Sequence, residues 1–265
     1  MKKIILAALL LAATFSVKAW NTAYDKAVYL VAAQNYNPKT LRLVQYYVNE
    51  DVAKASNHLA WHRKNGRHLE SAGWHKLHLD ASLQPAAKDE NDAYVQVEKA
   101  LEIIRNRKDH DDAVVSFAVH TVMNLIVDMH NLSNVVIEGI PLSGTDFQVG
   151  TSKGTANGKT AKITPYSWKS LWTHRYVTYH GAYSPQMWAK DIVIMHGNKK
   201  EEFSKGTLKD WTLDIGTYTK DIYGVLEAGN GNFLHPTIQA HEEFHMSCLA
   251  RAAFRIAVLL NENLK

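Results

Sequence analysis

The sequence predicts a mainly α domain with a small β-hairpin excursion around residues 135–163. Over most of the 265 residues, apolar side chains recur at three- and four-residue spacing, which is the period of a helix with one buried face. Within the excursion the pattern alternates, Gly, Ser, Thr and Lys are frequent, and Asn157-Gly158 is a strong hairpin signal. Hydrophobic residues make up 46% of the chain, which is enough for a sizeable core.

Helix ends are marked most clearly near the start of the chain. The helix predicted over 24–34 ends at residues 35–38, and a second helix begins after Pro38. A third is expected over 52–61. Further helices are predicted, in order, over 92–107, 111–130, 183–196, 207–227 and 236–262.

Residues 1–19 have the pattern of an export signal, so the predicted single domain spans 20–265. Two lysines precede an apolar stretch from Ile4 to Val17, and Val17-Lys18-Ala19 follows with small residues at the cleavage positions. This stretch is too short for a membrane span, and no other segment approaches one. Cleavage makes Trp20 the first residue and predicts a periplasmic or secreted protein.

Charge and cysteine content narrow the function further. The formal net charge of +4 includes three lysines of the signal, and without them 27 basic residues face 26 acidic ones. The chain therefore lacks the basic patch of a duplex-binding protein. Its 14 histidines favour a metal site. Cys248 is the only cysteine, which excludes an internal disulfide, and its apolar neighbours predict a buried thiol.

The segment His241-Glu242-Glu243-Phe244-His245 matches the H-E-x-x-H pattern of zinc metallopeptidases. On a helix both histidines share one face and the first glutamate is placed as a general base. The residues that follow form a core-packing stripe, and no third ligand is evident downstream. A metallopeptidase is therefore the least favoured of the three functions that we consider for this chain.

His120, Asn124 and Asp128 project from one face of the helix predicted over 111–130, because they stand four residues apart. An aspartate on the inward face of an apolar helix is costly unless it is hydrogen-bonded or binds a metal. The residues alone leave both interpretations open: a polar network that caps the helix, or a metal site. His75 is a further candidate ligand.

Taken together, these features resemble the S-one/P-one nuclease family, secreted zinc nucleases specific for single strands, whose helical fold is shared with zinc-dependent phospholipase C. The resemblance covers nearly the whole chain after the signal. The segments that carry it are Trp20, Ala33–Pro38, Ala55-Ser56, Trp74-His75, Asn124–Asn134, Ser170–Trp172, Trp211–Asp214 with Tyr223, and Ala250–Asn261.

The resemblance implies a cluster of three zinc ions, but only part of the ligand set is present. Trp20, His75 and Asp128 stand at matching ligand positions, and Asp25 replaces a family histidine as a possible oxygen ligand. The other ligand positions hold weakly coordinating amides or residues that do not coordinate zinc. These residues are Asn124, Asn134, Leu59, Lys169 and Thr173. A one-residue shift in the alignment offers His58, His120, His130 or His174 as substitutes.

From these residues we expect either a single zinc ion, held by Trp20, Asp25, His75 and Asp128, or no zinc ion. The leading hypothesis is an exported phosphodiester hydrolase acting on single-stranded nucleic acid or nucleotides, with Asp128 as its catalytic residue. Loss of zinc ligands predicts weak activity, a changed substrate or no activity. The alternative is a non-catalytic binding or scaffold protein that uses the same cleft, with Lys169 as an anion contact.

Overall fold

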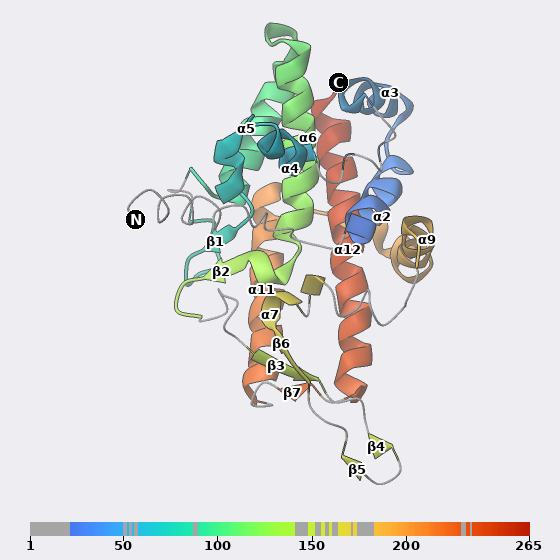
Figure 1. The fold of residues 1–265 in the computed structure, drawn as a ribbon. Coiled ribbons are helices and arrows are strands. Elements are labelled where there is room, and N and C mark those ends of the chain that lie inside the picture. Colours follow the sequence, from blue (N-terminus) through green and yellow to red (C-terminus); the bar gives the residue numbers. More distant parts are fainter. Residues whose placement is uncertain are drawn as a thin grey trace, which may run out of the picture.

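Two long helices, α6 (Asp112–Met129) and α12 (His235–Asn263), run side by side through the centre of the protein (Figure 1). This computed structural model confirms the mainly α fold. The residues it describes are 22–49, 52, 55, 58–86, 90–140, 148–151, 155–156, 159–160, 164–170, 172–173, 183–228, 232–233 and 235–265. The predicted signal and Trp20 lie outside them.

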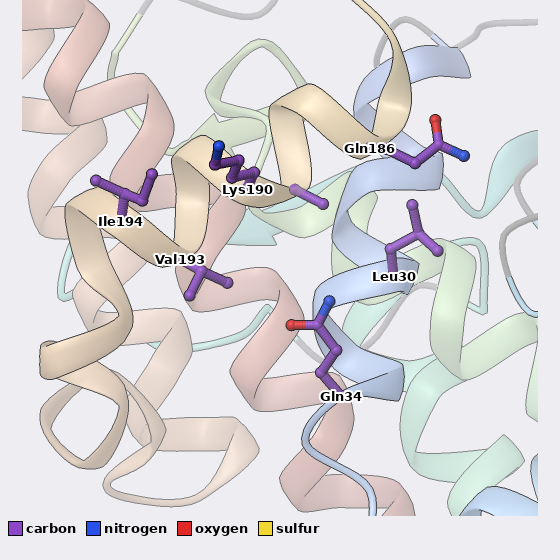
Figure 2. A pocket seen from close by; sticks show the side chains of 7 residues that line it. Leu30, Gln34, Gln186, Lys190, Val193 and Ile194 are labelled. Carbon is purple, nitrogen blue, oxygen red and sulfur yellow. The ribbon is translucent and has the colours of Figure 1, made fainter.

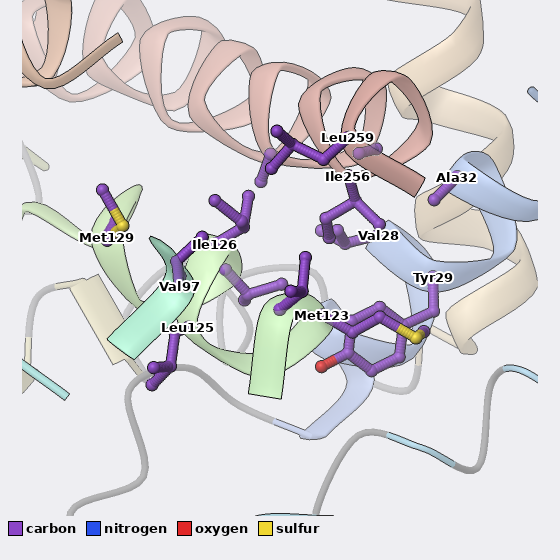
Figure 3. Packing of buried hydrophobic residues seen from close by; sticks show 14 of the residues in the cluster. Val28, Tyr29, Ala32, Val97, Met123, Leu125, Ile126, Met129, Ile256 and Leu259 are labelled. Atoms are coloured by element: carbon purple, nitrogen blue, oxygen red, sulfur yellow. The ribbon is translucent and has the colours of Figure 1, made fainter. Parts of the chain in front are cut away.

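The core lies where α6 and α12 meet α2 (Thr22–Ala33). Figure 3 shows Met123 and Ile126 of α6 near Ile256 of α12 and Val28 of α2, and all four side chains are fully buried. Burial of each such side chain contributes about 1.5–3 kcal/mol to folding. The three- and four-residue spacing of apolar side chains that predicted these helices therefore marks the positions that face one shared core.

Helix α6 is long and apolar enough to cross a membrane, with a mean hydropathy of 1.4 over its 18 residues. However, 67% of that stretch is buried inside the protein, between the other helices. A central helix of a helical protein has the same composition as a membrane span, and its burial identifies α6 as the former. The described residues thus show no clear membrane span.

The helix boundaries follow the capping residues that the sequence provides. Helix α3 (Pro38–Val48) begins with proline, and the Asn37 side chain accepts a 2.8 Å hydrogen bond from the Thr40 backbone N–H. It ends at Asn49, which adopts the left-handed conformation with φ 53°. The predicted stop and restart around Pro38 is confirmed.

Most other predicted helices agree with the structure to within two residues. The third is a correction: α4 spans His58–Lys64, so the helix predicted over 52–61 is displaced towards the C-terminus. The remaining helices include several short ones that the sequence did not predict. In chain order they are η3 (Leu69–Gly73), α5 (Ala93–Arg105), η4 (Arg107–Asp109), η5 (Leu132–Asn134), α7 (Trp168–Ser170), α9 (Pro185–His196), η7 (Gly197–Lys199), α10 (Lys200–Ser204) and α11 (Leu208–Ala228).

The predicted β excursion is present and consists of short strands. β3 (Gln148–Thr151) pairs antiparallel with β6 (Thr164–Ser167) and parallel with β7 (Asn232–Phe233). β4 (Thr155–Ala156) and β5 (Lys159–Thr160) pair antiparallel on either side of the predicted turn, whose residues 157–158 lie outside those described.

A parallel pair that the sequence did not predict positions the candidate site. β1 (Leu77–Leu79) pairs with β2 (Val135–Ile137), with Leu77 opposite Val135. β1 begins two residues after His75, and β2 begins seven residues after Asp128. The pairing therefore fixes the loop that carries His75 against the end of α6.

Burial of Cys248 gives a direct test of the α12 packing. Its thiol is 2% exposed, and burial raises its pKa to about 12. Because the thiolate is the reactive form, we expect no reaction with Ellman's reagent under native conditions and one equivalent in concentrated urea. Rapid modification of the native protein would contradict this packing.

Candidate functional site

His75 and Asp128 form a buried hydrogen-bonded pair at the end of α6. His75 Nδ1 lies 2.5 Å from Asp128 Oδ2, and the two residues are 8% and 6% exposed. The second ring nitrogen of His75, Nε2, is buried and makes no hydrogen bond with the described residues. The carboxylate thus orients the imidazole and leaves one nitrogen for a ligand or a proton.

The charges around this pair are mainly positive. Burial raises the pKa of Asp128, whereas His75, Arg63 and Lys169 oppose that rise. Burial lowers the pKa of Lys169, and so does the nearby charge of Lys76, while Asp128 acts in the opposite direction. Two cationic side chains, Arg63 and Lys169, therefore lie within electrostatic range of the Asp128 carboxylate.

Asp25, the other predicted oxygen ligand, approaches the same part of the core from α2. The pKa of Tyr29 is raised by burial and, in decreasing order, by the charges of Asp25 and Asp128. Both carboxylates therefore lie within electrostatic range of Tyr29. Only His75 and Asp128, of the four predicted ligands, are shown in direct contact with each other among the described residues. Trp20, the fourth, lies outside the described residues.

The amides at two family ligand positions are engaged with the protein backbone. Asn124 Nδ2 donates to the backbone oxygens of His120, at 2.9 Å, and Ala55, at 3.3 Å. Asn134 Nδ2 donates to the backbone oxygen of Asp128 at 3.2 Å. These two residues therefore belong to a polar network that ties α6 to the backbone, the first of the two interpretations of this helix face.

The remaining family ligand positions do not suit a metal either. Leu59 is buried and apolar, and the Thr173 hydroxyl donates to the Lys169 backbone oxygen at 2.8 Å. Lys169 itself brings a cation close to Asp128. In the described part of the chain, no group of three or more His, Cys, Asp or Glu residues is arranged to hold a metal ion. These residues do not fit a cluster of three zinc ions.

Two of the histidines offered as substitutes lie in a ring-stacked cluster. The rings of His58 and His120 are stacked, with centroids 3.5 Å apart and planes 6° apart. Their in-plane lone pairs therefore lie in parallel planes and do not converge on one ion at a bond length of about 2 Å. A third substitute, His130, accepts a hydrogen bond from Arg255. His174 lies outside the described residues.

The H-E-x-x-H segment lies on α12, and its second histidine belongs to the core. The His245 ring is fully buried and stacks on Trp172, with centroids 5.4 Å apart. Its Nε2 lies 3.3 Å from the Trp172 backbone oxygen, and burial lowers its pKa to about 3. This environment gives His245 a packing role, which weighs against the metallopeptidase hypothesis.

Sequence reasoning missed Arg63 and Lys76. Arg63 lies four residues after Leu59 on α4, so both side chains share one helix face. That spacing could have placed Arg63 beside the missing ligand position. Arg63 Nη1 donates to the Ser71 hydroxyl at 3.0 Å, which holds its side chain in place. Lys76 directly follows His75, and no pattern in the sequence marks it.

A separate pocket of about 320 Å³ lies between α2 and α9 (Figure 2). It is lined by apolar and amide side chains, including Leu30, Gln34 and Gln186, and its one ionisable lining residue is Lys190. None of the site residues predicted from the sequence lines it. A pocket without an acid–base pair offers no catalytic chemistry, so the His75–Asp128 site remains the functional candidate.

No protein-family model matches the chain, and a comparison with characterised proteins gives no significant match.

Proposed function

We propose that this chain is an exported member of the S-one/P-one nuclease family that binds a phosphate group of single-stranded nucleic acid or a nucleotide and has lost zinc-dependent hydrolysis. The observation that carries the proposal is the buried His75–Asp128 pair with Arg63 and Lys169 beside it. The motif order and the mainly α fold support the family, and the cationic side chains support the ligand.

Lys169 provides the strongest argument for an anionic ligand. Its side chain is half-buried, and it makes no ion pair with any residue that the structure describes. Burying a cation without a close partner is costly, and a bound phosphate oxygen would offset that cost. His75 Nε2 offers a neighbouring hydrogen-bonding group, and Arg63 adds a second positive charge.

The same arrangement of side chains favours phosphate binding over phosphate hydrolysis as the function. In the family, zinc stabilises the charge that develops on the phosphate during its hydrolysis. Lysine and arginine provide charge for recognition, but they do not activate water as a Lewis acid does. We therefore expect measurable affinity without turnover.

Binding can be tested with the mature protein that begins at Trp20, using a fluorescent 5′-phosphorylated single-stranded oligonucleotide in EDTA. We expect saturable binding that weakens about tenfold in Lys169→Gln and in Arg63→Gln, because each change removes a charge-assisted contact. Lys209→Gln, at an exposed position on α11, is the matched control and should bind like the parent. Equal affinity in all four proteins would refute the proposal.

A second candidate function is a phosphodiesterase that uses a single zinc ion. It is favoured by His75, because its Nε2 has no partner among the described residues and Asp128 orients its ring as a carboxylate orients a zinc-binding histidine. The described residues supply no third ligand beside this pair, so the ion would also need the Trp20 terminus. When bound, zinc would supply a Lewis acid, and Asp128 would keep the His75 ring oriented.

Metal content separates the two candidates. Elemental analysis combined with hydrolysis of bis(p-nitrophenyl) phosphate should show no zinc and no turnover if the binding proposal holds. One zinc ion and a turnover that both disappear in His75→Ala would establish the second candidate instead. Two or more ions per chain would contradict both. N-terminal sequencing of the exported protein checks that Trp20 is its first residue.

A further inference from the structure

A second pocket, with a polar lining, lies between α10, α11 and α12. The buried and half-buried polar groups of its lining are hydrogen-bond donors. It has a volume of about 280 Å³ and includes His196, Arg251 and Ser247 among its lining residues. None of the residues in the His75–Asp128 site lines it. A volume at the lower end of the range for ligand pockets suits a small molecule.

Arg251 is held in a fixed orientation by aromatic rings. Its guanidinium carbon lies 3.7 Å from the centre of the Phe203 ring and 4.7 Å from that of Tyr218. Phe203 is 3% exposed, so it forms a rigid support. Stacking covers the guanidinium faces and leaves its N–H edges as donors, which is the arrangement that binds a planar oxyanion with two parallel hydrogen bonds.

The N–H groups of Arg251 find no acceptor in the part of the chain that the structure describes. Arg251 makes no hydrogen bond or ion pair with the residues that the structure describes, although Glu202 and Glu243 line the same pocket. These N–H groups are not fully buried, so they face the open pocket, where an oxyanion would replace the water that hydrates them.

His196 is the second, independent indication of a ligand. It is 2% exposed and lines the pocket, and both ring nitrogens lack a hydrogen-bond partner within the described part of the chain. Burial lowers the pKa of His196, while the nearby backbone of Glu243 acts in the opposite direction. A neutral imidazole has one N–H, so His196 can donate one hydrogen bond to a ligand oxygen.

The charges of the pocket favour a monoanion. Lys199, Glu202 and Glu243 are exposed at its rim, whereas Arg251 is half-buried and His196 is buried. The two cationic and two anionic side chains sum to zero charge, so the pocket has no excess positive charge to stabilise the second charge of a dianion. The donors lie inside, and the acidic side chains lie outside.

We propose that this pocket binds a small organic carboxylate, with its carboxylate group on the edge of Arg251 and the N–H of His196, and its body against the aromatic wall. This site is separate from the phosphate-binding site proposed above. An aromatic carboxylate such as benzoate fits both the donors and the rings of Phe244 and Tyr218, which lie 5.6 Å apart.

The test is titration of the mature protein with benzoate, followed by calorimetry and by chemical-shift changes of the protein. We expect saturable binding that weakens at least about tenfold in Arg251→Gln. Arg251→Lys should also bind weakly, because a lysine keeps the charge but loses the planar donor edge. Arg105→Gln, at an exposed position on α5, is the matched control and should bind like the parent.

Two further ligands and one pair of variants make the outcome decisive. Benzamide has the shape of benzoate without the charge and should bind much more weakly. Lys169→Gln and Arg63→Gln should leave benzoate affinity unchanged, which separates the two sites. The proposal would be overturned if benzoate did not bind saturably, or if benzamide bound as tightly as benzoate. It would equally be overturned if inorganic phosphate bound more tightly than benzoate, or if a folded Arg251→Gln kept the parent's affinity.

Discussion

Replacing Arg255 with leucine will lower the free energy of unfolding by about 2–3 kcal/mol, the usual effect of leaving buried hydrogen-bond acceptors without their donor. Arg255 is 1% exposed and is the central member of a hydrogen-bonded network. Its Nε donates to the Phe203 backbone oxygen at 3.0 Å, and Nη2 donates to Asp214. Leucine leaves the buried Phe203 oxygen without a donor, whereas the Asp214 carboxylate is 45% exposed and regains water.

The third donor of Arg255 links α12 to the end of α6. Its Nη1 donates to His130 Nε2 at 2.9 Å, while His130 Nδ1 donates to the Ile126 backbone oxygen at 2.7 Å. Burial and the charge of Arg255 both keep the pKa of His130 well below its ordinary value, so the imidazole is neutral and accepts. The network therefore supports the helix end that carries Asp128.

Urea denaturation at neutral pH measures this effect. Arg255→Lys should recover only part of the loss, because an ammonium group does not reproduce three donors in a fixed plane. The matched control is Arg105→Leu, which removes an exposed arginine bonded to Asn263 and should change stability by less than about 1 kcal/mol. A loss in Arg255→Leu no larger than that of the control would contradict the network.

Much of the helical fold could be predicted from the sequence because helix periodicity is a local signal. The stop before Pro38 and the apolar stripe of α6 required only neighbouring residues. The β1–β2 pair could not be predicted in this way. Each strand has three residues, too few to show alternation, and their partners lie far apart in the chain.

The sequence pointed to His75, Asp128 and Lys169 as residues of one site, but it did not point to Arg63. The resemblance placed His75 and Asp128 together, and the structure brings their side chains into hydrogen-bond contact. It did not reveal that Asn124 bonds to Ala55 across 69 residues, or that Arg63 lies near Asp128. Such contacts depend on how helices pack, and a residue's own neighbours in the chain carry no information about that.

Acidification will destabilise the protein steeply below about pH 6.5, the ordinary pKa of histidine. Burial lowers the pKa values of His120 and His245 to about 3, so both are neutral in the folded state well below that pH. The unfolded chain then binds more protons than the folded one, and stability falls as pH falls. Each of these histidines adds a slope of about 1.4 kcal/mol per pH unit until its folded-state pKa is reached.

Chemical denaturation at a series of pH values from neutral to about 5 measures this slope. His120→Phe isolates one contribution, because phenylalanine keeps a ring against His58 but does not titrate. We expect this variant to lose some stability at neutral pH, since the 2.8 Å contact of His120 with the Ser116 backbone oxygen disappears. Its pH slope should be shallower than that of the parent, by an amount that approaches about 1.4 kcal/mol per unit near pH 5. Parallel pH profiles for the two proteins would mean that His120 is protonated in the folded state, contrary to its burial between α4 and α6.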